Sequence, residues 1–162
     1  MINRRQFLQI TGATATGLLT GGMTSLLNAG GARAAEEESS QFKPDLDIAL
    51  KAAEDEIAIL PGDPTGVWRF QGQLLKGDRT SLVDIERSYL GPIIRARTGQ
   101  KVRIRFTNEI ADQSIVHWHG LHVPADMDGH PRLAIPRGES YVYEFEIRNR
   151  AGTYWYHPHP HG

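Results

Sequence analysis

Two His-x-His pairs constrain this chain more than any other feature of its sequence. One pair lies in His117-Trp118-His119-Gly120, and the other lies in Tyr154-Trp155-Tyr156-His157-Pro158-His159. Because side chains along a β-strand return to the same face every two residues, both imidazoles of a pair are expected to point to one side of a strand. Imidazole nitrogen binds copper, zinc, iron and nickel, and Cu(II) is the divalent ion that it binds most tightly. The two pairs therefore predict a metal site built on strands.

The composition limits which residue types can bind a metal and which classes of protein the chain can belong to. Cysteine is absent from the 162 residues, so histidine and carboxylate are the metal ligands available. The length predicts one domain of ordinary size. The formal net charge is −1 and the sequence has no basic stripe, which argues against a nucleic-acid-binding protein.

Residues 1–34 have the features of an export signal. Arg4 and Arg5 precede a weakly apolar stretch rich in glycine and threonine, and Ala32-Arg33-Ala34 supplies a small-x-small cleavage pattern. The alternative is a membrane anchor, which needs about 20 predominantly apolar residues. The paired arginines favour a twin-arginine-type signal, so a periplasmic or otherwise exported protein is expected, with membrane contact only during export. Residues 35–45 follow as an acidic linker.

The pattern from residue 67 onward is that of an all-β protein. Apolar residues alternate with arginine from Val102 to Phe106, and a similar alternation runs from Tyr141 to Ile147. Turn signals such as Asp128-Gly129 separate the expected strands. Short strands between regular turns predict a β-sandwich or barrel. For residues 46–60 the apolar spacing fits both a helix and a strand, and the period does not decide between them.

These motifs resemble the first cupredoxin domain of the multicopper oxidases, the family that includes laccases, bilirubin oxidases and bacterial copper-resistance oxidases. The resemblance rests on residues 117–121, 127–131 and 152–159, and it extends upstream to residues 91–95 and 102–108. It implies an all-β fold, a cupredoxin-like Greek-key β-sandwich, over residues 46–162.

The resemblance also implies roles for individual residues. His117 would bind a type 2 copper, while His119, His157 and His159 would bind the type 3 copper pair. Together they would form half of a trinuclear cluster that reduces dioxygen to water with electrons from a reducing substrate. Asp128 would assist proton delivery and orient a water on the type 2 copper. The Asp128-Gly129 sequence fits a plain turn equally well.

The chain departs from the family because it lacks the cysteine that a type 1 copper site requires. Family members carry that site in a later domain, and their first cupredoxin domain continues past the second histidine pair. The chain is therefore expected to be the N-terminal portion of an exported multicopper oxidase, incomplete at its C-terminal end and inactive alone. One alternative is a short non-catalytic copper-binding protein. Another is a mononuclear zinc or iron β-sandwich enzyme that uses three of the four imidazoles.

Overall fold

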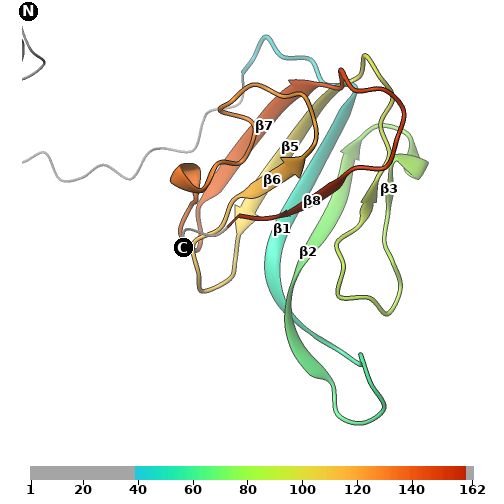
Figure 1. The fold of residues 1–162 in the computed structure, drawn as a ribbon, viewed down its shortest axis with the longest axis vertical. Helices are drawn as coiled ribbons and strands as arrows, with labels where there is room; N and C mark the ends of the chain where they lie inside the picture. Colours follow the sequence, from blue (N-terminus) through green and yellow to red (C-terminus); the bar gives the residue numbers. More distant parts are fainter. Residues whose placement is uncertain (1–38, 160–162) are drawn as a thin grey trace, which may run out of the picture. The chain divides into compact units, whose positions relative to one another are not determined.

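A computed structural model of the chain describes residues 39–159, and the predictions for residues 1–34 lie outside that range. Within it no helix is long and apolar enough to cross a membrane. The described chain is built from strands and two short 3-10 helices (Figure 1). In chain order these are β1 (Leu46–Ile57), β2 (Thr65–Lys76), η1 (Arg79–Ser81), β3 (Leu82–Val83), β4 (Ile93–Ile94), β5 (Lys101–Asn108), β6 (Val116–His119), η2 (Pro131–Leu133), β7 (Ser140–Glu146) and β8 (Trp155–Pro158).

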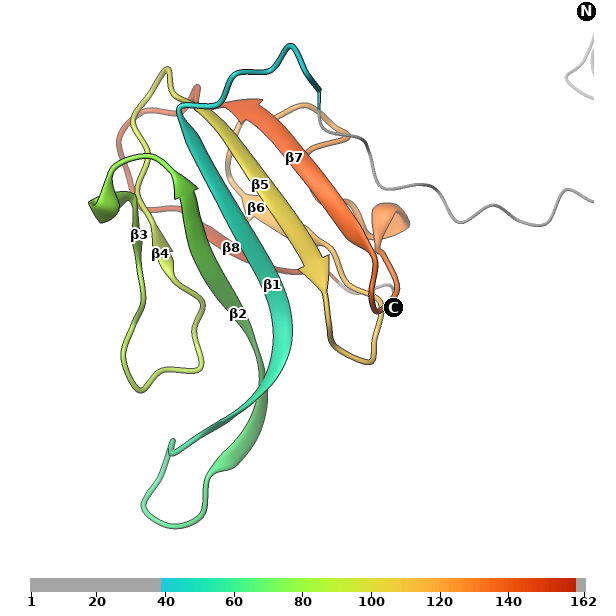
Figure 2. The ribbon, with the colours of Figure 1, turned by 180° about the vertical axis from the view of Figure 1, so that it is seen from behind.

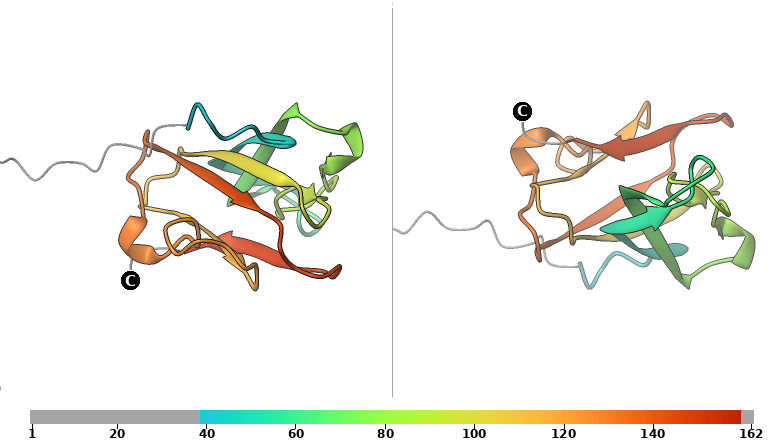
Figure 3. Two further views of the ribbon diagram at one scale, coloured as in Figure 1. Left: turned by 90° about the horizontal axis from the view of Figure 1, so that it is seen from above. Right: turned by 90° about the horizontal axis from the view of Figure 1, so that it is seen from below.

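The strands form two main layers, which Figure 3 shows from above and from below. One layer is a four-stranded sheet in the order β2-β1-β5-β7, in which β1 and β5 run parallel and the other neighbours antiparallel. The other contains the antiparallel pair β6-β8, which lies in front of the large sheet in Figure 1 and behind it in Figure 2. A third, two-stranded sheet joins β3 to β4. The all-β prediction is confirmed.

The segment that the sequence left open between helix and strand is the strand β1. From Leu46 to Ala52 its backbone pairs with β5 on one side, and from Asp47 onward it pairs with β2 on the other. Both of its faces are largely covered, since Leu46, Asp47 and Ile48 are all buried. A strand covered on both faces loses the apolar–polar alternation that identifies a half-exposed strand.

The core lies between the large sheet and the β6-β8 pair. Phe106 and Tyr143 project from the large sheet, and Val116 and Trp118 project from β6. The rings of Trp118 and Tyr143 meet edge to face, with centroids 5.3 Å apart at 90°. This is a geometry that aromatic pairs prefer. Because alternate residues of β6 fill the core, the residues between them face away from it.

The opposite face of the large sheet carries a row of three charged residues, of which Asp47 and Arg103 are buried and Glu144 is half-buried. Asp47, Arg103 and Glu144 lie in register across β1, β5 and β7. Arg103 Nη2 lies 2.6 Å from Glu144 Oε1, and Arg103 Nη1 lies 3.7 Å from Asp47 Oδ2. Nη2 also donates to the carbonyl oxygens of Ser39 and Phe42, at 3.1 and 2.8 Å. This guanidinium therefore fastens the segment before β1 to the sheet.

Candidate metal centre

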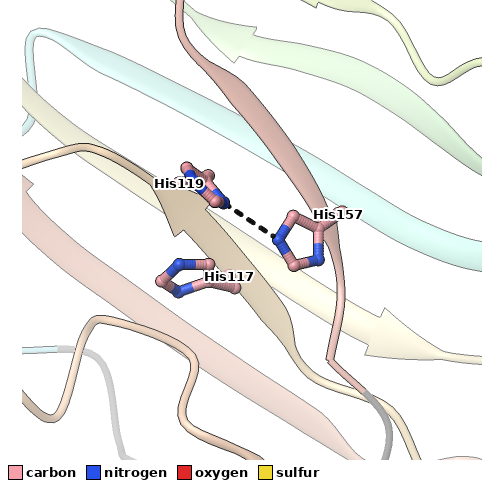
Figure 4. Close-up of side chains that lie close together, drawn as sticks. All are labelled: His117, His119 and His157. Carbon is pink, nitrogen blue, oxygen red and sulfur yellow. Dashed lines mark hydrogen bonds between the residues drawn. The ribbon is translucent and has the colours of Figure 1, made fainter.

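Four histidine side chains gather on the outward face of the β6-β8 pair. One ring nitrogen from each of His117, His119 and His157 lies within 4.8 Å of the others. Figure 4 shows these three rings turned toward one another, two from β6 and one from β8. The ring of His159 lies 5.4 Å from that of His117 and 5.8 Å from that of His157, between centroids. The four predicted ligands thus lie together, three of them in one group and the fourth beside it.

The strands hold the two pairs in place as the sequence predicts. On β6, Val116 and Trp118 are buried while the two histidines are not. The register of the pair sets His117 opposite His157. β8 ends at Pro158, as expected of a residue without a backbone N–H. The next amide, that of His159, donates to the carbonyl of Ile115 at 2.8 Å, which keeps this fourth ring beside β6.

The turn at Asp128-Gly129 orients two of the four rings. His117 Nδ1 lies 2.6 Å from the carbonyl oxygen of Asp128, and His159 Nδ1 lies 3.1 Å from that of Gly129. Because a carbonyl oxygen can only accept, Nδ1 carries the proton in the neutral form of both rings, and Nε2 of that form keeps its lone pair. Metal-binding histidines are commonly oriented in this way. Sequence reasoning missed these two partners, since they are backbone atoms that any residue could supply.

The carboxylate of Asp128 is a more distant neighbour of His117 than its backbone is. Its Oδ1 lies 3.5 Å from His117 Nδ1, and the side chain is 42% exposed. Gly129 has a φ of +74°, as a turn of this kind requires. A role for the Asp128 carboxylate in proton delivery therefore stays a prediction.

The backbone of β6 is held at two points next to His117. Inside the core, the hydroxyl of Tyr143 accepts from the amide of Val116 at 2.9 Å and donates to its carbonyl at 3.0 Å. Burial raises the pKa of Tyr143 well above its ordinary value, so this hydroxyl keeps its proton. At the second point, the backbone of Gly129 packs so closely on Val116 that a Cβ would overlap the carbonyl oxygen. From the sequence, Tyr143 was expected only to be one of the alternating apolar residues between Tyr141 and Ile147.

The rings of His119 and His157 have the separation that two ligands of one shared ion require. His119 Nδ1 lies 3.4 Å from His157 Nε2, the contact drawn in Figure 4. Two nitrogens about 2.0–2.1 Å from one tetrahedral ion, the distance known for zinc, lie about 3.3–3.4 Å apart. His157 Nδ1 lies 2.9 Å from the carbonyl oxygen of Pro158, which leaves Nε2 as the ligand atom. The donor set therefore fits a metal that prefers imidazole, such as copper.

Other histidines lie outside this group. His130 caps η2 and accepts from the amide of Arg132 at 3.2 Å. His122 is exposed, and its backbone amide donates to the side chain of Asn149. His161 lies outside the described residues.

Two packed layers of strands, with three imidazoles grouped and a fourth beside them on the outer face of one layer, define a cupredoxin-like β-sandwich with a candidate metal site. The family model described as multicopper oxidase matches residues 67–162. The chain belongs to the multicopper oxidase family, and copper is the metal that this family implies.

Individual relatives agree with this assignment. The multicopper oxidase mco of Staphylococcus aureus is 34% identical over 88 residues, which cover 54% of this chain and 20% of the relative. A copper resistance protein A homolog of Pseudomonas syringae pv. tomato is 36% identical over 111 residues, 61% of this chain and 18% of the relative. The crystal structure of the McoA multicopper oxidase from Aquifex aeolicus matches with a TM-score of 0.59 at 34% identity, over 74% of this chain and 24% of that one. The chain spans about a fifth of the length of these curated relatives.

Proposed function

We propose that this chain is the copper-binding N-terminal portion of a multicopper oxidase. The full-length enzyme would oxidise a reducing substrate and pass the electrons to dioxygen, which becomes water. The observation that carries the proposal is the group of His117, His119 and His157 on two paired strands, with His159 beside it. Membership of the family supports copper as the metal.

The four imidazoles are proposed as half of a trinuclear copper site. His117 is assigned to the type 2 position, and His119, His157 and His159 are assigned to the type 3 positions. Bound copper would supply the one-electron steps of dioxygen reduction. The chain's own residues present the ligand nitrogens, because the turn carbonyls hold the Nδ1 protons of His117 and His159. Asp128, whose carboxylate is part-exposed, is proposed to move protons between solvent and this site.

The electron-accepting type 1 copper would be held elsewhere in the full-length enzyme. That site needs a cysteine thiolate, and the sequence contains no cysteine. The chain alone is therefore proposed to bind copper without oxidising a phenol, a pigment or a metal ion.

Export by a twin-arginine-type signal is part of the same proposal. It rests on Arg4, Arg5 and the Ala32-Arg33-Ala34 pattern. Changing both arginines of the pair to lysine is expected to retain the protein in the cytoplasm, as measured by cell fractionation. Unchanged export of that variant would contradict the signal assignment.

Copper titration of the purified chain tests the site. We expect Cu(II) to bind with an electron paramagnetic resonance signal of the type 2 kind and without intense blue absorption, because no thiolate is present. A His117→Ala variant should bind Cu(II) at least about tenfold more weakly, the loss that follows even from disturbing the partners of a metal ligand.

A His122→Ala variant is the matched control, since this exposed histidine lies outside the group. It should bind copper as the unchanged chain does. The three-histidine group by itself would also suit a mononuclear zinc or iron site. One tightly held zinc or iron per chain, with no copper uptake, would contradict the copper assignment in favour of that alternative.

A further inference from the structure

We propose that Trp155 is a positioning residue that holds the rings of His119 and His157 in the orientation needed to bind one ion. The proposal rests on the proposed copper site and adds to it a side chain that binds no metal. Trp155 is the first residue of β8. The register places it opposite His119, and it lies two residues before His157 on the same strand. A strand returns to the same face every two residues, so the indole shares the face of the ligands.

The indole contacts both rings at once. It stacks on His119 with centroids 4.6 Å apart and planes 27° apart. Its centroid lies 4.5 Å from that of His157, with the planes at 35°. These are the two rings whose facing nitrogens are 3.4 Å apart. One rigid side chain therefore restrains both members of the pair that has the separation of ligands on a shared ion.

His119 has particular need of such a restraint. The rings of His117, His157 and His159 each place Nδ1 against a backbone carbonyl. Over residues 39–159, the ring of His119 has one hydrogen bond, and its partner is His157. When both facing nitrogens direct lone pairs at one ion, no proton remains between them and this hydrogen bond is lost. The His119 ring then keeps an edge contact with the ring of His117, at 5.5 Å between centroids, and the closer stacking on Trp155, which fixes the plane of the ring.

Burial in the core does not explain a tryptophan at this position. Trp155 is 58% exposed, whereas Trp118 is 4% exposed and packs on Tyr143 and Phe145 inside the core. The tryptophans of the two histidine motifs thus have different surroundings. Trp118 packs the interior, while Trp155 packs against the metal-binding rings.

Three variants test the proposal by copper titration against a competing chelator. Trp155→Ala is expected to bind Cu(II) about tenfold more weakly, as loss of a ligand's orienting partner does, with altered copper hyperfine splitting in the electron paramagnetic resonance spectrum. Trp155→Phe, which keeps a stacking ring, should restore most of the affinity and the signal. Trp68→Ala is the control, because this half-exposed tryptophan lies on β2. Equal thermal unfolding of Trp155→Ala and Trp155→Phe would show that the difference in binding is not a difference in folding.

A second measurement uses the metal-free chain. In its nuclear magnetic resonance spectrum, the His119 ring protons should show contacts to the Trp155 indole and to His157. The contacts to His157 should weaken in Trp155→Ala and persist in Trp155→Phe. A His119 ring that stays ordered beside His157 in Trp155→Ala would overturn the proposal.

The two measurements separate this proposal from the proposed function. If the unchanged chain binds copper and Trp155→Ala binds it equally well, the positioning role is wrong and the copper site stands. If the unchanged chain binds no copper, the proposed function is wrong, and the metal-free spectra still decide whether Trp155 orders the ring of His119.

Discussion

Replacing Gly129 with alanine is expected to abolish most copper binding and to lower the free energy of unfolding by about 2–5 kcal/mol, since overpacking costs about 1–3 and a left-handed backbone about 1–2 kcal/mol. Gly129 has a φ of +74°, and its Cβ would overlap the carbonyl oxygen of Val116 and lie 2.8 Å from the amide nitrogen of His117. Both neighbours are backbone atoms, so the turn itself must move. It would carry away the carbonyls that orient His117 and His159. Urea unfolding and copper titration measure the two effects.

Gly138→Ala is the matched control for this substitution. Gly138 also has a positive φ, +87°, but a Cβ there would meet nothing within 4 Å. The Gly138→Ala variant should therefore have a free energy of unfolding only about 1–2 kcal/mol lower, the cost of the left-handed backbone, and an unchanged copper affinity. If Gly129→Ala bound copper as tightly as Gly138→Ala, the turn would not have the orienting role described for it.

An Arg103→Met variant is expected to lower the free energy of unfolding by about 3–5 kcal/mol, the cost of leaving a buried charge without its partner. Arg103 is 4% exposed. Its loss would leave the Glu144 carboxylate without the guanidinium at 2.6 Å, whereas Asp47 would keep Arg105 at 2.8 Å. Chemical denaturation measures the change. Faster proteolysis before β1 should accompany it, because the carbonyls of Ser39 and Phe42 would lose the guanidinium that joins them to β5.

An exposed ion pair supplies the comparison. Lys51 and Glu109 lie 3.2 Å apart, and their side chains are 44% and 47% exposed. Lys51→Met is expected to change stability by no more than about 1 kcal/mol, as is usual for pairs in solvent. If Arg103→Met lowered the free energy of unfolding no more than Lys51→Met does, the row formed by Asp47, Arg103 and Glu144 would contribute little to the stability of the fold.

The strands were predictable where only one face is apolar. The alternation near Val102–Phe106 and Tyr141–Ile147 predicted β5 and β7, because one face of each packs in the core while the other carries charged residues. β1 could not be assigned in this way. Its pairing with both β2 and β5 made it a strand; β2 follows it directly as a hairpin partner, whereas β5 lies far away in the sequence.

The grouping of the candidate metal ligands was predictable to the same extent. The spacing of His117, His119, His157 and His159 identified the group, because the two-residue period of a strand converts sequence spacing into a shared face. The atoms that orient the rings could not be found in this way. The carbonyls of Asp128 and Gly129 and the indole of Trp155 become neighbours of the rings only through tertiary packing.

The candidate metal site and the turn that orients its rings come from three separate segments of the chain, and this would couple metal affinity to folding. His119 is 38 residues from His157, and Gly129 is 30 residues from His159. In an unfolded chain these segments are far apart, and the free energy of metal binding would have to offset the entropy lost in bringing them together. In the native fold the strands already hold them together, so metal binding carries no such entropy loss. A metal that binds the native state and scarcely binds the unfolded one shifts the folding equilibrium toward the native state. Copper is therefore expected to raise the free energy of unfolding of this domain.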